Sequence, residues 1–306
     1  MNKNTIIAWL RIFRIPNIFT VPGEAMAGYL LCRGDISKNE FIYLIIASIS
    51  FYVFGLVTND IADIREDRKS SPRRPLPAGD ISISSASYAS LILILLALGF
   101  AFLTGAGTFT VGLVILAAIV GYNFLSTRGS LFPGPLLLSL CRLLNIMLGV
   151  TAAGNELFRP VMLMTLLVCE TLFILGVSVA ASVENKPDKA YTVSGAIIIC
   201  FSHLIFIAGA MLSVEKIITY AGELPPAVKL GILIWVISVV ISLKSTLRWF
   251  TNNKNGILSS DIGALIRNLI FIQAAACAFG GFIYPAIWIC LLIIPCYILS
   301  KFFYQS

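Results

Sequence analysis

Ten long apolar segments run through this chain and constrain its fold more than any other feature. A helix needs about 20 mostly apolar residues to cross the hydrocarbon core of a membrane. The last two segments are joined only by the short stretch GGFIYP. We therefore expect an all-α membrane protein, a bundle of nine or ten transmembrane helices. The segments cover residues 15–32, 40–60, 84–104, 108–126, 134–153, 160–183, 191–213, 226–248, 262–282 and 285–303.

The composition excludes a soluble globular protein. Hydrophobic residues make up 58% of the chain and charged residues 12%, whereas a soluble domain carries about 25% charged residues. The polar stretches between the apolar segments are short, so we expect residues 1–306 to form a single membrane-embedded domain. The seven cysteines include no C-x-x-C pair, and we interpret them as small core residues.

The distribution of Lys and Arg predicts the orientation, because cytoplasmic loops retain positive charge. With the N-terminus inside, sixteen of the 22 basic residues lie on the cytoplasmic side and five on the other, while Arg142 lies within a segment. We expect an integral membrane protein surrounded by lipids, in a bacterial inner membrane, with its N-terminus and its aspartate-rich loops in the cytoplasm. Ten helices would return the C-terminus to the same side, and Lys301 favours ten. This bias explains the net charge of +7 without a nucleic-acid partner.

The most polar stretch, NDIADIREDRKSSPRRPLPAG at residues 59–79, directly follows an apolar segment. Its acidic and amide side chains are spaced to lie along one face of a continuing helix. Like charges at this spacing repel one another, and a divalent cation between them would remove the repulsion. Mg²⁺ prefers hard oxygen ligands and is commonly held by one or two carboxylates plus phosphate oxygens. The predicted Mg²⁺ ligands here are Asn59, Asp60, Asp63 and Asp67.

Basic residues follow these carboxylates, and Arg and Lys donate charge-assisted hydrogen bonds to phosphate. Carboxylates and arginines together suit a metal-chelated diphosphate. Tyr122 closes the fourth apolar segment and would reach the same mouth of the bundle. The predicted diphosphate-binding residues are Arg14, Arg68, Lys69, Arg73, Arg74 and Tyr122.

Charged residues inside apolar segments are costly and mark functional sites. Arg142 and Asn145 lie one turn apart in the fifth segment. We expect both to face a central cavity as catalytic residues, where Arg142 would meet a phosphate or an acidic partner. Glu170 lies alone in the sixth segment, and the sequence leaves open whether it lines the cavity or pairs with Arg142.

The stretch NDIADIRED followed by RRPLPAG resembles the first aspartate-rich motif of the UbiA superfamily of intramembrane prenyltransferases. LRIFRIPNIFTVPGEAMAGYLL resembles the first helix of that superfamily, and GYNFLSTRGSLFPGPLLLSLCRLLNIMLG resembles its fourth and fifth helices. The resemblance implies a bundle of about nine spans. It also implies Mg²⁺-dependent transfer of an isoprenyl group from its diphosphate to an aromatic or other lipophilic acceptor, with Asp63 and Asp67 as catalytic metal ligands.

The second aspartate motif of the superfamily, a D-x-x-x-D at the end of the sixth helix, is altered here. The corresponding stretch reads GVSVAASVENKPDKAYTVSG and retains Glu184 and Asp188 as its carboxylates. These two residues would share a second cation if the helix continues through both. Pro187 favours a break near Lys186 instead.

Two other functions remain open at this stage. A secondary transporter also builds polar sites among broken helices, but those sites lie near the membrane midplane, whereas the charge cluster here follows the end of a segment. The altered second motif also allows a protein that binds prenyl lipids without catalysis. Release of diphosphate from an isoprenyl diphosphate distinguishes the enzyme from both.

Overall fold

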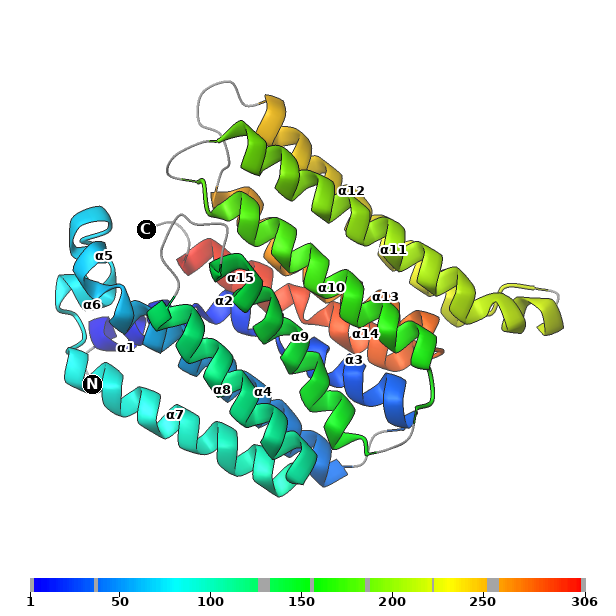
Figure 1. Cartoon of the computed structure of the whole chain (residues 1–306), viewed down its shortest axis with the longest axis horizontal. Coiled ribbons are helices and arrows are strands. Elements are labelled where there is room, and N and C mark those ends of the chain that lie inside the picture. Colours follow the sequence, from blue (N-terminus) through cyan, green and yellow to red (C-terminus); the bar gives the residue numbers. More distant parts are fainter. Residues whose placement is uncertain are drawn as a thin grey trace.

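The computed structural model describes residues 3–35, 38–125, 133–154, 157–184, 188–221, 223–251 and 259–303. Every regular element in these ranges is an α-helix, which confirms the predicted fold class. The long helices run side by side in one bundle (Figure 1). Nine spans in this part of the chain are long and apolar enough to cross a membrane: α4 (Lys38–Ala62), α7 (Ile83–Thr104), α8 (Ala106–Leu125), α9 (Gly134–Ala152), α10 (Pro160–Ala181), α11 (Lys189–Ala221), α12 (Pro226–Thr251), α13 (Ser259–Phe279) and α14 (Ile283–Leu291) with α15 (Ile293–Phe303).

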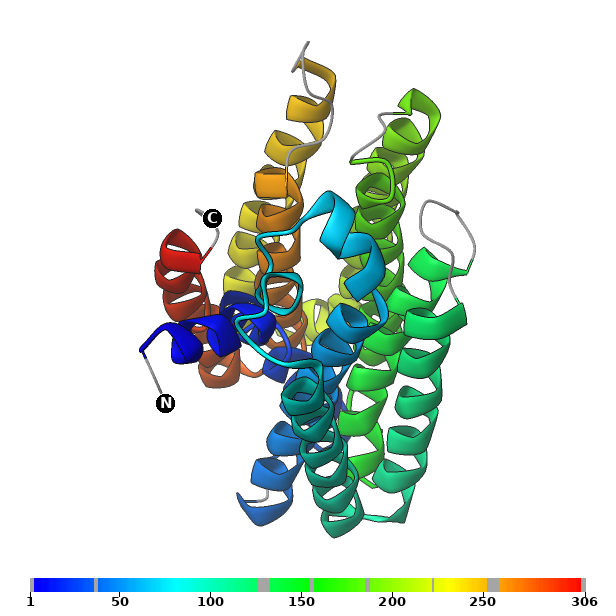
Figure 2. The same cartoon turned by 90° about the vertical axis from the view of Figure 1, so that its left-hand side faces the viewer.

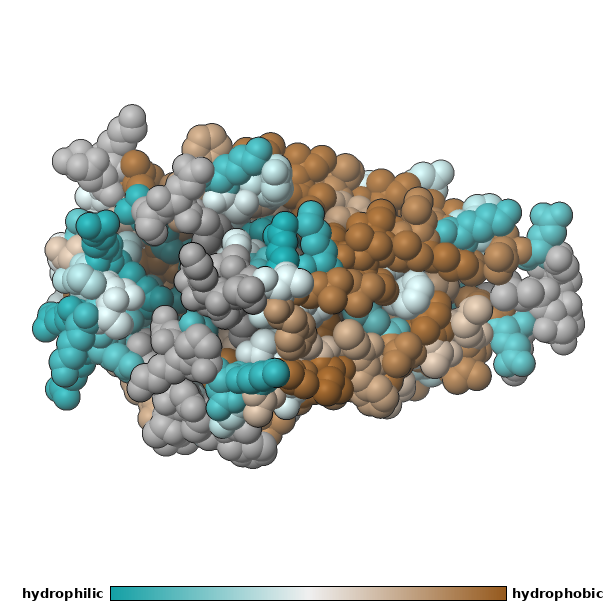
Figure 3. Space-filling view, turned by 90° about the horizontal axis from the view of Figure 1, so that it is seen from above, coloured by the Kyte–Doolittle hydropathy of each residue, from teal (hydrophilic) through white to brown (hydrophobic). Residues whose placement is uncertain are grey.

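The surface of the bundle matches a membrane environment. Figure 3 shows a broad apolar region along the bundle and polar side chains gathered at its two ends. Most of the large hydrophobic side chains that are exposed belong to the spanning helices, among them Leu95 of α7 and Leu204 of α11. A soluble protein rarely exposes so much contiguous apolar surface, so the chain is an integral membrane protein.

The prediction of one continuous helix over residues 15–32 is wrong. The chain instead forms α1 (Lys3–Ile12), α2 (Ile15–Ile18) and α3 (Pro22–Arg33). Pro22 is the first residue of α3, where its missing N–H is tolerated, whereas inside a continuous helix its ring would clash with the preceding turn. With 12 residues, α3 is about 18 Å long, which is short for a complete crossing.

The positions of the two ends of the described chain bear on the choice between nine and ten crossings. Phe303, at the end of α15, lines the same pocket as Arg11 of α1 and Arg14, the residue before α2. The two ends of the described chain therefore lie at the same end of the bundle, which requires an even number of crossings. If the broken α2–α3 segment crosses as well as the nine long spans of the described chain, the number of crossings is ten, which is the number we expect.

Several short elements lie across one end of the bundle, which we call the aspartate end. They are α1, α5 (Ile64–Ser70) and α6 (Pro75–Ala78), and they lie in front of the ends of the spanning helices in Figure 2. Ala8 and Ile12 of α1 pack with Leu76 of α6 in a small apolar cluster. Ile6 and Ile7 of α1 are exposed, which is typical of a helix that lies in the interface of a membrane.

Glycines allow α3 to approach α9 closely. A Cβ atom at Gly149 would collide with the carbonyl oxygen of Ala25, and one at Gly28 would collide with that of Ile146. Small residues at such crossings let two backbones touch, which is a common source of stability for helices in membranes. The short α3 is thereby fixed against a full-length neighbour.

Candidate active site

The predicted metal-binding residues lie where α4 passes into α5. The backbone N–H of Asp63 donates to the carbonyl of Asn59 at 2.9 Å, and that of Asp67 donates to Asp63 at 2.9 Å. Helical hydrogen bonding therefore continues from α4 into α5, and only Asp63 lies outside the two helices. The expected continuation of the helix is interrupted at this single residue.

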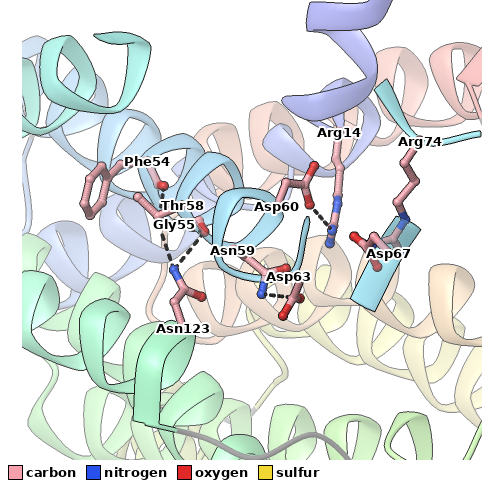
Figure 4. A network of polar contacts seen from close by, with 10 residues as sticks. All are labelled: Arg14, Phe54, Gly55, Thr58, Asn59, Asp60, Asp63, Asp67, Arg74 and Asn123. Atoms are coloured by element: carbon pink, nitrogen blue, oxygen red, sulfur yellow. Dashed lines mark hydrogen bonds and ion pairs between the residues drawn. The ribbon is translucent and has the colours of Figure 1, made fainter. Parts of the chain in front are cut away.

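The four oxygen-bearing side chains form two groups rather than one row. On one side, the amide of Asn59 donates to Asp63 Oδ2 at 3.0 Å. Figure 4 shows this pair toward Asn123 of α8, whereas Asp60 and Asp67 lie toward Arg14 and Arg74. The junction of α4 and α5 thus carries the Asn59–Asp63 pair on one side. On the other side it carries Asp60 and Asp67, each paired with an arginine.

Each of the two arginines forms an ion pair with one carboxylate. Arg14 Nη2 contacts Asp60 Oδ1 at 3.2 Å, and Arg74 Nη1 contacts Asp67 Oδ2 at 2.7 Å with the Asp67 side chain only 2% exposed. Arg14 has φ 45° and is the one residue other than glycine with positive φ in the described part of the chain. This conformation costs about 1–2 kcal/mol for a residue with a Cβ atom. Strain of this kind is tolerated where a site depends on it.

The end of α8 is fastened to α4 beside this group. Asn123 Nδ2 donates to Thr58 Oγ1 at 2.7 Å and to the carbonyl of Gly55 at 3.3 Å. Tyr122, which precedes it, is half-buried. The end of α8 is therefore joined to α4 through Asn123, and a role of Tyr122 in binding diphosphate stays a prediction. Arg68 and Lys69 are exposed on α5.

A pocket of about 520 Å³ lies next to the arginine-paired carboxylates. It brings together α1, the turn before α2, the end of α4, the segment between α5 and α6, and the last residue of α15. Its charged lining is strongly basic. The charged residues that line it are Arg11, Arg14, Asp60, Arg73 and Arg74.

The altered second motif does not form one helical face. α10 ends at Ala181 and α11 begins at Lys189, so the condition under which Glu184 and Asp188 would share a cation on one helix is not met. Glu184 accepts a hydrogen bond from Ser259 of α13. Asp188 Oδ1 accepts from the backbone N–H of Ala190 at 2.8 Å and thereby caps α11. Lys186 and Pro187 lie outside the described residues.

The donor set at the end of α4 fits Mg²⁺. Among the described residues, no group of three or more His, Cys, Asp or Glu side chains is placed to hold a metal alone. Mg²⁺ commonly takes only one or two carboxylates and completes its coordination with phosphate oxygens and water. The hard oxygens of Asn59 and Asp63, with Asp67 one turn further on, meet that requirement when a phosphate is present.

Arg142 and Asn145 lie in a separate buried network, away from these aspartates. Arg142 Nη1 donates to Glu24 Oε1 at 2.5 Å, and Asn145 Nδ2 donates to Glu24 Oε2 at 2.6 Å. The Arg142 guanidinium lies 5.1 Å from the ring centroid of Tyr52. Tyr52 precedes Asp60 by eight residues on α4, which is about 12 Å along a helix. The acidic partner of Arg142 is thus Glu24, and the structure does not bring Arg142 or Asn145 to Asp63.

The same network satisfies the backbone at the break before α3. Asn145 Nδ2 also donates to the carbonyl of Val21 at 3.2 Å, and Gln273 Nε2 donates to that of Thr20 at 3.2 Å. Irregular backbone at membrane depth requires such partners, because no water is present to supply them. Gln273 also donates to Glu170 at 2.9 Å, which places Glu170 in this network.

Glu24 and Gln273 were missed by the sequence analysis. Glu24 lies within the first apolar segment and is fully buried. It meets the criterion that identified Arg142, a charged residue inside an apolar segment, so the signal was available. Gln273 gave no comparable signal, because an uncharged amide is less unusual than a charged side chain within a membrane-spanning segment.

The sequence is similar to those of known proteins. The chain is 36% identical over 93 residues to the digeranylgeranylglyceryl phosphate synthase of Methanocaldococcus jannaschii, a match that covers 29% of this chain and 32% of that protein. The chain thus matches about a third of the length of that relative.

Two solved structures share the fold. A UbiA homolog from Aeropyrum pernix K1 has a TM-score of 0.66 at 16% identity, covering 85% of this chain and 96% of that chain. A UbiA homolog from Archaeoglobus fulgidus bound to GPP and Mg²⁺ has a TM-score of 0.57 at 14% identity, covering 94% and 99%. The model of the UbiA prenyltransferase family matches residues 23–248. The chain belongs to the UbiA prenyltransferase family.

Proposed function

We propose that this protein transfers an isoprenyl group from an isoprenyl diphosphate to a lipophilic acceptor within the membrane, with Mg²⁺ bound at the aspartate end. The observation that carries the proposal is the pairing of Asn59 with Asp63 at 3.0 Å where α4 ends, beside a pocket lined with arginines. The A. fulgidus homolog that shares the fold is bound to GPP and Mg²⁺, which supports a diphosphate donor and this cation.

The residues of the chain divide the work of the reaction. Asn59 holds the carboxylate of Asp63 in place, and these two residues would hold Mg²⁺, whereas the predicted ligand Asp67 pairs with Arg74 in the other group. When bound, Mg²⁺ neutralises the leaving diphosphate. Arg68 and Lys69, which are exposed on α5, would donate hydrogen bonds to the phosphate oxygens of the donor. The apolar helices hold the isoprenyl tail and exclude water that would capture an allylic cation.

The transfer balances without a further reactant. The bond between C1 of the isoprenyl group and the diphosphate oxygen breaks, and its electron pair leaves with the diphosphate. A nucleophilic atom of the acceptor forms the new bond to C1 and then loses its proton. Because the M. jannaschii relative is named for a glyceryl phosphate lipid, we propose a hydroxyl of a glyceryl phosphate lipid as the acceptor, with an aromatic carbon as the second candidate.

The test uses the full-length protein in lipid nanodiscs with geranylgeranyl diphosphate, a glyceryl ether phosphate and Mg²⁺. We expect release of diphosphate together with a prenylated lipid detected by mass spectrometry, and loss of both on addition of EDTA. Binding of the donor without release of diphosphate under any condition would favour a protein that only binds prenyl lipids. Movement of the intact donor across sealed vesicles would favour a transporter.

A further inference from the structure

The structure assigns a second phosphate-binding site to this protein. We define the arginine pocket by Arg11, Arg14, Asp60, Arg73, Arg74 and Phe303. We propose that it binds the phosphate group of the lipid acceptor, while the donor diphosphate binds with Mg²⁺ on the side of Asn59 and Asp63. This inference rests on the proposed function and deepens it, because it divides the predicted basic residues between two substrates.

The charge of the arginine pocket suits a phosphomonoester. Four guanidinium groups line it, and two carboxylates pair with them: Asp60 with Arg14 at 3.2 Å and Asp67 with Arg74 at 2.7 Å. Within the described ranges, no carboxylate pairs with Arg11 or Arg73. Counted over the described residues, the pocket and its two paired carboxylates therefore carry an excess of two positive charges. A phosphomonoester carries about −1.5 to −2 at neutral pH, so it matches this excess, and arginine binds phosphate with two parallel hydrogen bonds.

The donor site and the arginine pocket use different sides of the same helix end. Asn59 and Asp63 lie toward α8, whereas Asp60 lies toward Arg14 and the pocket (Figure 4). Asn59 and Asp60 are adjacent in sequence, and a helix with its side chains is about 10 Å across. An acceptor anchored by its phosphate in the pocket would thus be held close to the donor without sharing its phosphate ligands.

The arginine pocket also lies where a lipid headgroup can reach it. Phe303 is the last residue of the spanning helix pair α14–α15 that the structure describes. Ile298 and Phe302 of α15 are exposed, and so are Ile6 and Ile7 of α1. A lipid could therefore place its phosphate among the arginines while its chains remain along the apolar surface of α15, as expected for a substrate that arrives from the bilayer.

The experiment compares Arg11→Gln and Arg73→Gln with wild type in nanodiscs of zwitterionic lipid. The control is Arg65→Gln, an exposed arginine of α5 that does not line the pocket. We expect each pocket substitution to raise the KM for a glyceryl ether phosphate about tenfold, because one charge-assisted hydrogen bond to phosphate is lost. The KM for the donor should not change. The preference for this acceptor over the same lipid without phosphate should fall, and Arg65→Gln should behave as wild type.

A binding measurement without donor or Mg²⁺ separates this site from the proposed reaction. We expect a short-chain glyceryl ether phosphate to bind wild type more tightly than Arg11→Gln or Arg73→Gln. If this difference in binding is seen but no turnover occurs, the phosphate site is supported and the proposed transferase activity is contradicted. A rise in the KM for the donor instead would overturn the site, as would equal binding by all variants. The pocket variants could instead lose activity with an unchanged KM for the acceptor and regain it when anionic lipid is added to the nanodiscs. That result would mean that the pocket binds lipids of the bilayer, and it would overturn the acceptor role.

Discussion

Asp63 joins the two halves of the candidate site, because it separates α4 from α5 and accepts the hydrogen bond of Asn59 at 3.0 Å. Asp63→Asn keeps the shape of the side chain and removes its charge. We expect the variant to fold and to release diphosphate at least about a hundredfold more slowly than wild type, because stabilisation of the leaving group is lost. The control is Glu66→Gln, an exposed carboxylate of α5. Near-wild-type turnover of Asp63→Asn would remove Asp63 from the site.

Glu184 and Asp188 are expected to differ in their effect on Mg²⁺. Asp188 caps α11, and Asn caps a helix as well as Asp does, so Asp188→Asn should leave the Mg²⁺ titration of diphosphate release unchanged. Glu184 remains a candidate ligand of a second cation, and Glu184→Gln should raise the Mg²⁺ concentration at half-maximal rate several-fold, because an amide is a weaker ligand than a carboxylate. Superimposable curves for Glu184→Gln and wild type would instead indicate a single cation at the first motif.

The spacing of the first motif predicted which residues gather at the site, but not how they are paired. Local helical periodicity places Asn59 near Asp63 because they are four residues apart. The contact between Arg14 and Asp60 spans 46 residues and depends on the left-handed conformation of Arg14. Arginine is not a residue that favours this conformation. No pattern in the sequence predicts it, so the division of the carboxylates into two groups required the structure.

At the scale of elements, the buried network ties the short α3 to α9, α10 and α13. Two carboxyl groups, Glu24 and Glu170, share it with the single guanidinium of Arg142. Glu24 accepts from Arg142 and Asn145, whereas Glu170 accepts only from Gln273 among the described residues, and its buried Oε2 has no hydrogen-bond partner there. We expect Glu170 to be neutral, because burial of a carboxylate without a compensating donor is far more costly than burial of a neutral carboxyl group.

A neutral Glu170 would make the two glutamates respond differently to substitution. Glu170→Gln replaces a neutral carboxyl group with a neutral amide, and we expect the melting temperature in detergent to stay close to that of wild type. Glu24→Gln leaves the charge of Arg142 buried without a partner, which costs about 3–5 kcal/mol, so that variant should unfold at a clearly lower temperature. Equal destabilisation by both substitutions would mean that Glu170 is ionised.

The crossing of α3 and α9 offers a second test at this scale. Gly149→Ala would push a Cβ atom against the carbonyl of Ala25, and the two helices would have to separate. We expect a loss of about 1–3 kcal/mol, the usual cost of overpacking, measured as a lower melting temperature. Gly99→Ala on α7 is the matched control, because no atom lies within 4 Å of its added Cβ. A Gly149→Ala variant as stable as wild type would show that this crossing adapts.

Hydropathy predicted nine of the ten apolar segments as membrane-spanning helices, because length and apolar content are the requirements for crossing. The segment at 15–32 met the same criterion, yet it is broken between Ile18 and Pro22. Hydropathy does not register backbone geometry, so a proline within an apolar run goes unnoticed. The partners that make the break tolerable, Asn145 and Gln273, come from distant parts of the chain and are defined only by tertiary packing.

At the scale of the whole molecule, the predicted metal-binding and phosphate-binding residues lie at the aspartate end of the bundle, whereas Arg142 and Asn145 lie in the separate buried network. The end of α4 and the arginine pocket lie there, together with the contact of Glu184 with Ser259. The other end is held by structural contacts, such as the hydrogen bond of Arg159 to the carbonyl of Gly280 at 3.0 Å. This asymmetry agrees with a site that takes a charged diphosphate from one aqueous compartment and a lipid acceptor from the bilayer.

The topology of the ten crossings yields the last prediction. Phe303 and Arg14 line one pocket, so the end of α15 lies at the aspartate end, and the distribution of Lys and Arg along the sequence predicts that this side is cytoplasmic. A fluorescent protein fused after Ser306 should therefore fluoresce, whereas alkaline phosphatase fused after Leu224, in the turn between α11 and α12, should be active. Phosphatase activity at both positions would indicate an odd number of crossings. Reversal of both reporters would retain ten crossings and invert the orientation, which would place the diphosphate site on the opposite side of the membrane.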